Sequence, residues 1–269
     1  MMTTFTFTAQ AVFTALYLAA AYLYLKYFFS VDRRCGQLAA RVLMAGLVMH
    51  LVTLAARIVH LGYLPIATVC DALSFAGFII ALAYVCIEKF SRDLSMGAFV
   101  APIICIAQLI SLLWFDPSGD LPVRYRSPWF EIHVSGSMFA FASFAIATIG
   151  AVLYLVLYRE LHRKRPGRFY SRLTSLEQLD RVNFYGSLLG VILLAVAIFT
   201  GFNWMREIRA SADLRLDARI IATWFTLAVY LTGLLVRRIT RASGRTLSLL
   251  SIAGFILVIL AFAFEGISH

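Results

Sequence analysis

The chain has 269 residues, of which 61% are hydrophobic and 14% are charged, and its formal net charge is +10. Soluble domains average about 45–50% apolar and about 25% charged residues, so this composition excludes an ordinary soluble fold. The positive charge does not indicate a nucleic-acid partner, because the basic residues lie between apolar segments, as membrane topology requires.

Apolar runs of about 20 residues recur along the sequence, and this length crosses a ~30 Å hydrocarbon core as a helix. The runs are continuous and do not alternate over about ten residues, so they predict helices and not a transmembrane barrel. The predicted fold is all-α, a polytopic membrane helix bundle that forms a single transmembrane domain over residues 1–269. The expected spans are 8–29, 39–60, 64–87, 96–115, 129–158, 184–204, 218–236 and 247–265.

The distribution of Lys and Arg predicts the orientation. The odd-numbered loops between the expected helices hold fifteen of these residues, including seven between Arg159 and Arg181, whereas the even-numbered loops hold six. By the positive-inside rule, the odd loops are cytoplasmic and both termini face outward. We expect a multi-pass protein of the cell inner (cytoplasmic) membrane, in contact with membrane lipid.

The second expected helix carries four polar residues, His50, Thr53, Arg57 and His60, at spacings of three, four and three. These spacings place them on one helical stripe. An ionisable side chain at membrane depth costs on the order of 2.5–3.5 kcal/mol, so the stripe is expected to face the bundle interior. Two roles stay open for Arg57, an ion pair with Asp71 or the binding of an anionic ligand.

Histidines also lie at the expected outer ends of two other helices. His133 is near the start of the fifth helix, and His269 is the last residue of the sequence. With the orientation above, both share the outer face with His60 and with the loop from Arg206 to Asp217. Two histidines from different helices on one side satisfy the geometric requirement of a bis-histidine iron site, although a single interfacial histidine is more often not a ligand.

Motifs of common enzymes are missing from the sequence. It contains no Gly-rich phosphate-binding loop, no H-E-x-x-H helix and no G-x-S-x-G elbow. Its four cysteines form no C-x-x-C pair, which gives no support for a zinc or thioredoxin-like site. Hydrolase and nucleotide-driven pump functions are therefore not indicated.

Several motifs together are more specific. Residues 173–183 read L-T-S-L-E-Q-L-D-R-V-N, Trp129 precedes His133-Val134, and Thr200-Gly201 precedes Trp204. These motifs resemble the L-P-S-L-E-x-L-D-R-L-N, W-x-x-x-H-V and T-G-x-x-W motifs of the cytochrome c assembly protein family, which includes the CcsA and HemX-like membrane proteins. Further similarities lie at Gly62 to Phe75, Gly244-Arg245, Ile252 to Phe255 and Gly266 to His269.

Two features of haem-presenting family members differ here. Leu216 to Ile220 stands in place of their Trp-rich loop and retains an acid, Asp217, and a basic residue, Arg219. Leu235 stands where those members have a membrane histidine. The chain is therefore more similar to the HemX-like branch.

The resemblance implies a haem-handling integral membrane component of cytochrome c assembly, which binds and presents haem at the outer face and is not an enzyme. Haem is the implied cofactor, with His133 and His269 as its axial ligands. The other implied binding residues are Trp204, Arg206, Asp217, His60 and Arg57. The implied protein partner is either another cytochrome c assembly subunit or a haem-biosynthesis enzyme.

Two alternatives stay open. The first is a HemX-like membrane regulator or scaffold for a haem-biosynthesis enzyme, which would act through the basic segment from Arg159 to Arg181. The second is a secondary transporter that uses the stripe from His50 to His60, although the sequence shows neither paired broken helices nor inverted repeats.

The orientation can be tested by labelling single cysteines in a background without Cys35, Cys70, Cys86 and Cys105. Because residues 159–183 are predicted to be cytoplasmic and the loop from Arg209 to Asp217 external, an impermeant thiol reagent should modify Ser211→Cys in intact cells but not Ser171→Cys. The reverse labelling pattern would overturn the predicted orientation.

Overall fold

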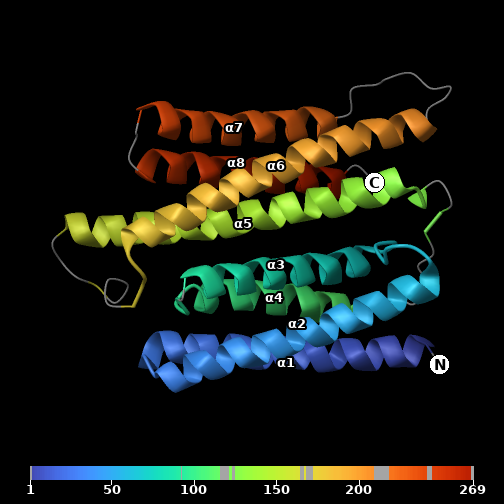
Figure 1. The fold of residues 1–269 in the computed structure, drawn as a ribbon, viewed down its shortest axis with the longest axis horizontal. Helices are drawn as coiled ribbons and strands as arrows, with labels where there is room; N and C mark the ends of the chain where they lie inside the picture. The colour runs from blue at the N-terminus through green and yellow to red at the C-terminus, as the bar shows by residue number, and fades with distance from the viewer. Residues whose placement is uncertain are drawn as a thin grey trace. The chain divides into compact units, whose positions relative to one another are not determined.

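The computed structural model describes residues 2–91, 93–115, 121–122, 125–163, 167, 172–208, 218–240 and 244–267. Within these ranges the chain forms eight helices and no strand, which confirms the predicted all-α fold (Figure 1). The helices are α1 (Met2–Ser30), α2 (Arg33–Leu61), α3 (Val69–Ser91), α4 (Gly97–Leu113), α5 (Pro128–His162), α6 (Leu176–Ile208), α7 (Ala218–Thr240) and α8 (Gly244–Ile267).

The helices have the length and composition of membrane spans. Six of them contain a segment that is long and apolar enough to cross a bilayer, and the apolar parts of α4 and α8, Gly97–Leu113 and Gly244–Leu260, are shorter. The α5 helix has 35 residues and is therefore about 52 Å long at 1.5 Å per residue, well beyond a ~30 Å hydrocarbon core. The chain is a multi-pass membrane protein.

The third helix begins later than the sequence predicts, at Val69 and not at residue 64. Gly62 ends α2 in the left-handed conformation, with φ 75°, and donates its N–H to Ile58 O at 2.8 Å. Thr68 then caps α3, because its hydroxyl accepts the N–H of Asp71 at 3.1 Å. Two local capping interactions therefore convert the predicted start of the helix into a turn.

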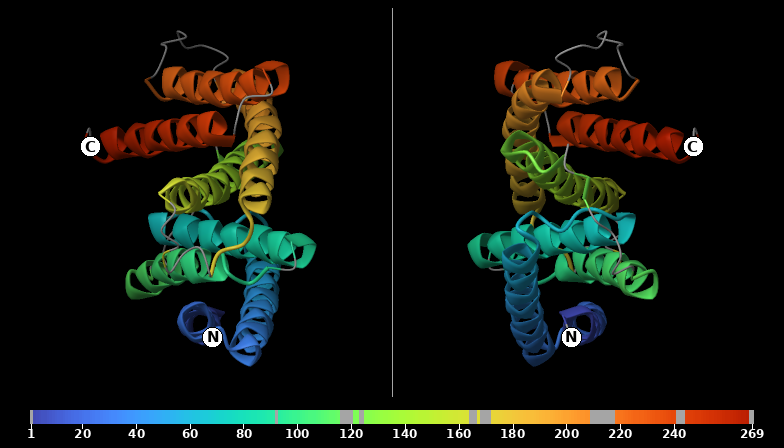
Figure 2. Two further views of the ribbon diagram at one scale, coloured as in Figure 1. Left: turned by 90° about the vertical axis from the view of Figure 1, so that its left-hand side faces the viewer. Right: turned by 90° about the vertical axis from the view of Figure 1, so that its right-hand side faces the viewer.

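The described residues form two compact units, Met1–Ser127 and Pro128–His269. In unit 1, α1 packs against α2 and α4, and α3 packs against α4 and α2 (Figure 2). Two buried tyrosines, Tyr24 and Tyr84, donate hydrogen bonds to Oε2 of Glu88 at 2.5 and 2.9 Å. These bonds join α1 to the end of α3 that lies away from its capped start.

In unit 2, α5 packs along α6 and α8, and α7 packs against α8 and α6. The core of this unit is built around Phe144 and Tyr230, whose rings stack at a centroid distance of 3.8 Å. Ala140, Val191, Leu194, Leu227 and Leu234 surround them. The α6 helix crosses obliquely between its neighbours, which lets it contact all three other helices of the unit (Figure 1).

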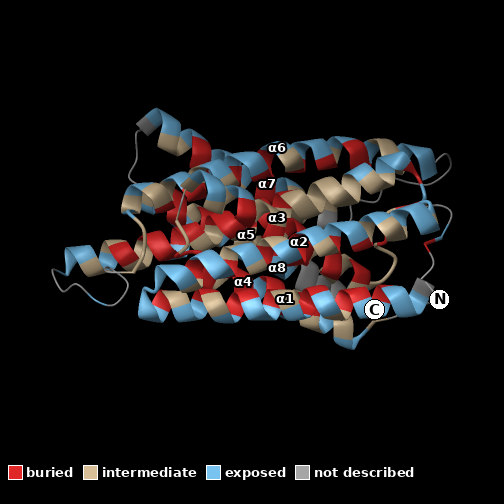
Figure 3. Cartoon of the chain, turned by 60° about the horizontal axis from the view of Figure 1, so that its bottom comes forward, coloured by how far each residue is buried: buried red, intermediate tan, exposed pale blue. Residues whose placement is uncertain are grey.

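The helices bury stripes of residues and not whole turns (Figure 3). Many large apolar side chains are exposed, such as Val59, Phe90 and Phe199. In water such a surface would be costly, but against lipid tails it requires no cover. Packing between the helices therefore depends on close contact and on polar side chains more than on burial of apolar area.

The L-D-R-V-N motif at the start of α6 joins three helices of unit 2. Asp180 forms a bidentate ion pair with Arg237 of α7, in which Arg237 Nη2 and Asp180 Oδ2 are 2.6 Å apart. Asn183 is fully buried, and its Oδ1 accepts a hydrogen bond of 2.7 Å from the hydroxyl of Ser251 on α8. Its amide group also donates to Ser248 Oγ at 3.4 Å. The motif is therefore a structural junction within the bundle.

Removal of the Asn183 side chain should destabilise unit 2. Asn183→Ala leaves the buried hydroxyls of Ser248 and Ser251 without this partner, and such a loss costs about 1–3 kcal/mol. We expect a lower thermal midpoint of the detergent-solubilised protein. The matched control is Asn203→Ala, because within the described part of the chain the Asn203 amide bonds only to Phe199 O of its own helix. Equal midpoints for the two variants would contradict the assigned junction.

Candidate functional site

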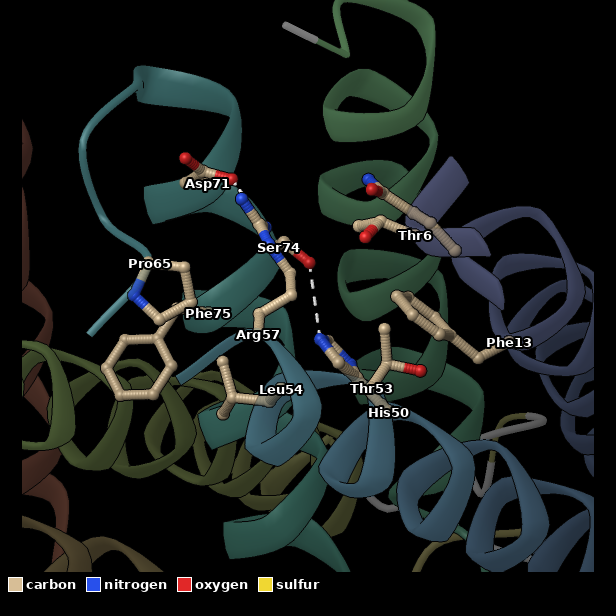
Figure 4. Close-up of a pocket in the computed structure, with 11 residues that line it drawn as sticks. Thr6, Phe13, His50, Thr53, Leu54, Arg57, Pro65, Asp71, Ser74 and Phe75 are labelled. Carbon is tan, nitrogen blue, oxygen red and sulfur yellow. Dashed lines mark hydrogen bonds and ion pairs between the residues drawn. The ribbon is translucent and has the colours of Figure 1, made fainter. Parts of the chain in front are cut away.

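A polar pocket lies inside unit 1, among side chains from α1, α2 and α3 (Figure 4). The α2 residues predicted to form a stripe supply one wall, and their burial follows the prediction for His50 and Thr53. The remainder is lined by polar side chains of α1 and α3 and by apolar ones, among them Phe13 and Phe75. The pocket therefore combines polar and apolar side chains from three helices of unit 1.

An ion pair between Arg57 and Asp71 links α2 to α3 at this pocket. Arg57 Nη1 and Asp71 Oδ1 are 2.7 Å apart, and the side chains are 19% and 7% exposed. Figure 4 shows the guanidinium group directed at the carboxylate. This pair is one of the two roles that the sequence leaves open for Arg57.

His50 is held from both sides of its ring in this pocket. The Ser74 hydroxyl donates its single proton to Gln108 Oε1 at 3.2 Å. In the contact of 3.2 Å between Ser74 Oγ and His50 Nε2, the imidazole N–H is therefore the donor and Ser74 Oγ the acceptor. Nδ1 then accepts from the Tyr17 hydroxyl at 3.3 Å. Phe13 stacks on the ring at 4.0 Å. Both nitrogens are used within unit 1, so His50 has no lone pair left for a metal.

The pocket is small. Its volume is about 10 Å³, which is about the smallest cavity that can hold one water molecule. Outside the pocket lining, Gly77 lets α3 approach α4 closely, since a Cβ at that position would lie 2.1 Å from Gln108 Nε2. The conformation described therefore favours a structural role for Arg57 and Asp71 over the binding of an organic anion.

The prediction that His60 shares the interior stripe is wrong, because its side chain is exposed. Ten residues separate it from His50, and at about 100° per residue they rotate the side chain by about 80° from the direction of His50. Its position in the last turn of α2, beside the Gly62 cap, takes it further from the packed part of the helix. His60 and Arg57 belong to unit 1, whereas His133, Trp204 and Arg206 belong to unit 2.

His133 lies in the second turn of α5 and is half-buried against α6. Its Nδ1 is 2.7 Å from the carbonyl oxygen of Ala197. A carbonyl oxygen can only accept, so Nδ1 carries the proton and, in the neutral ring, Nε2 carries the lone pair. Among the described residues Nε2 has no hydrogen-bond partner. Unlike His50, this imidazole retains an atom that can coordinate iron.

Aromatic side chains surround His133. The Trp204 ring lies nearly parallel to the imidazole at a centroid distance of 6.2 Å, and Phe130 contacts Trp204 at 4.9 Å. Arg206, two residues after Trp204 at the exposed end of α6, has its guanidinium carbon 5.4 Å from the centre of the Phe202 ring. The structure thus brings together the predicted residues His133 and Trp204, with a cation close by along the same helix.

The remaining predicted site residues, His269 and Asp217, lie outside the described residues. Within the described part of the chain, no three His, Cys, Asp or Glu side chains are grouped as a metal site. The coordination that this part of the chain offers is therefore that of one axial imidazole, which suits an iron already held in a porphyrin.

Two contacts at the site are not evident from the sequence alone. The Ala197 carbonyl belongs to the backbone, and Gly201 shows its role only in three dimensions, because a Cβ there would lie 2.5 Å from His133 Nδ1. The signal in the sequence was the T-G-x-x-W motif itself, which places a glycine and a tryptophan three residues apart on one helix face.

Comparison with known proteins gives consistent matches. The family model described as Cytochrome C assembly protein matches residues 66–267. Protein HemX of Brevibacillus brevis is 24% identical over 249 residues, which cover 92% of this chain and 91% of that protein. The cytochrome c biogenesis protein CcsA of Guillardia theta is 24% identical over 77% of this chain and 75% of its own length. The inner membrane protein YpjD of Escherichia coli K12 is 25% identical over 70% of each chain.

The Arg57 and Asp71 pair can be tested by single and double replacement. Arg57→Leu or Asp71→Asn alone should destabilise unit 1, because removal of one member of a buried pair costs about 3–5 kcal/mol. The double variant should recover much of the lost expression and thermal midpoint. Arg41→Leu, at an exposed position of the same helix, is the control. Single variants that behave like this control would show that the two side chains do not support each other.

Proposed function

The chain belongs to the cytochrome c assembly protein family, and we propose that it handles haem, which it binds and presents at the membrane surface without catalysing a reaction of its own. The observation that carries this proposal is the bond of 2.7 Å between His133 Nδ1 and the Ala197 carbonyl, which leaves Nε2 as a ligand atom. His50, by contrast, uses both of its ring nitrogens within unit 1.

The chemistry of the surrounding residues fits haem. Haem supplies an iron whose axial positions accept imidazole nitrogens, and its macrocycle is flat and apolar with two propionates at one edge. His133 would hold the iron, and Trp204 would cover the apolar edge of the site. Arg206, exposed at the end of the same helix, would pair with a propionate. His269 is the second axial ligand in this proposal, on the basis of the family resemblance.

The membrane in which this occurs is, in our proposal, the cytoplasmic membrane of the cell, with the start of α5 and the end of α6 at its outer face. The positive-inside rule supports this orientation, since the basic segments follow α5 and α7. The printed name of one relative, inner membrane protein YpjD, is consistent with such a location. The implied partner is another cytochrome c assembly subunit, which would receive or deliver the haem.

A regulatory function is the second candidate, and one structural observation favours it. The end of α5 and the start of α6 present exposed charged side chains, among them Arg159 and the ion pair of Arg181 with Glu177, whose members are 66% and 74% exposed. Such a surface could dock an acidic partner such as a haem-biosynthesis enzyme. This function would not need His133.

Replacement of His133 separates the two functions. His133→Ala should remove bound haem or change its Soret band in the purified protein, and it should lower the yield of c-type cytochromes in cells, because an axial ligand is lost. Added imidazole should partly restore the spectrum. His162→Ala is the control, since His162 is exposed near the other end of α5. Unchanged spectra and cytochrome yield in the His133 variant would favour the regulatory function.

A further inference from the structure

The part of α6 that faces His133 consists of Ala197, Thr200, Gly201 and Trp204, and we name it the α6 seat. All four residues contact or support the imidazole from one helix face. The Ala197 carbonyl oxygen accepts a hydrogen bond of 2.7 Å from His133 Nδ1 and a second one of 3.1 Å from the Thr200 hydroxyl. Trp204 lies parallel to the ring at an interplanar angle of 20°. The seat thus contacts the ring at one nitrogen and over its plane.

Gly201 is the part of the seat where any side chain would meet the His133 ring. A Cβ at this position would lie 2.5 Å from Nδ1 and 2.7 Å from Cε1 of His133, distances that real Cβ atoms essentially never show. The imidazole rests directly on the helix backbone, where an alanine methyl group would displace it. The absent side chain therefore sets how closely the ring approaches the Ala197 carbonyl.

We infer that the α6 seat is a positioning element that fixes His133 in the Nδ1–H tautomer, so that Nε2 is the atom presented to haem iron. This inference rests on the proposed function and adds to it the coordinating atom and the residues that select it. A histidine ligand to a metal commonly donates its other ring N–H to a carbonyl or carboxylate, which fixes the tautomer and orients the ring. Here the W-x-x-x-H-V motif of α5 supplies the ligand and the T-G-x-x-W motif of α6 supplies its support.

The tautomer can be measured without haem. The protein is labelled with ¹⁵N-histidine, placed in lipid bilayers and studied by solid-state NMR at about pH 8.5, about two units above the ordinary histidine pKa of 6.5, so that the rings are neutral. The resonance of His133 is identified by its absence in His133→Gln. We expect the Nδ1–H tautomer for His133 and the Nε2–H tautomer for His50, which is the internal control. An Nε2–H tautomer at His133 would overturn the inference.

The contribution of Gly201 is tested by a double-mutant cycle. Gly201→Ala should lower haem affinity by roughly ten- to a hundredfold, the usual effect of losing a residue that supports a metal ligand. The matched control is Gly136→Ala on α5, whose Cβ would lie at an ordinary 3.6 Å from Ala197 Cβ, and it should leave the affinity within about twofold. Equal losses in the two variants would contradict a specific role for Gly201.

His133→Gly completes the cycle and covers the case in which Gly201→Ala impairs folding. With the imidazole ring removed, the added methyl group has room, so Gly201→Ala should lower the thermal midpoint in the wild-type background but not in the His133→Gly background. The same loss in both backgrounds would show that the methyl group does not meet His133. If the wild-type protein bound no haem, the proposed function would fail, while the tautomer and the thermal cycle would still decide whether the seat holds the ring.

Discussion

A polar side chain in the hydrocarbon core has no water to bind, so it must find its partner inside the protein. In this chain that constraint determines how the helices of each unit meet. The pair of Arg57 and Asp71 joins α2 to α3, and just beyond the expected spans the pair of Asp180 and Arg237 joins α6 to α7. Apolar helix faces can pack against each other in several relative positions, whereas a hydrogen bond or ion pair between two helices forms in only one of them. The polar residues therefore fix the arrangement that apolar packing alone would leave less specific.

His50 and His133 show how two histidines packed between helices can differ in what their ring nitrogens are free to do. His50 uses both ring nitrogens, one with the Tyr17 hydroxyl and one with Ser74, and so serves the packing of unit 1. His133 uses only Nδ1, with a backbone carbonyl of α6. An imidazole that is held by one nitrogen and has a lone pair on the other is at once fixed in place and reactive toward a metal. Binding and presentation of haem require both properties.

The sequence predicts the helices well, because a continuous run of about 20 apolar residues has the length and composition of a membrane-spanning helix. It also offers the pairing of Arg57 with Asp71 as one of two roles for Arg57, and the structure contains this pair. The start of α3 was not predicted, because it depends on the local caps at Gly62 and Thr68. His60 was assigned to the interior because two correct spacings were extended by a third, with which the accumulated helical rotation becomes too large.

The seat of His133 lies beyond what a sequence pattern can show. The W-x-x-x-H-V and T-G-x-x-W motifs start 71 residues apart, at Trp129 and Thr200. Their contact depends on the register of α5 against α6, which the side-chain volumes along the whole interface decide. Family resemblance indicated that each motif matters but not that they meet. The junction at Asn183 is similar, since its serine partners on α8 have no sequence signal of their own.

The central claim is that this chain binds haem through an imidazole presented by α5. The most direct measurement is a titration of the purified wild-type protein with haem under reducing conditions, followed by the Soret band and corrected for haem in detergent alone. The account predicts a saturable shift of the band to that of a histidine-ligated haem, with one haem per chain at saturation. A titration in which the spectrum never departs from that of haem in detergent would contradict it.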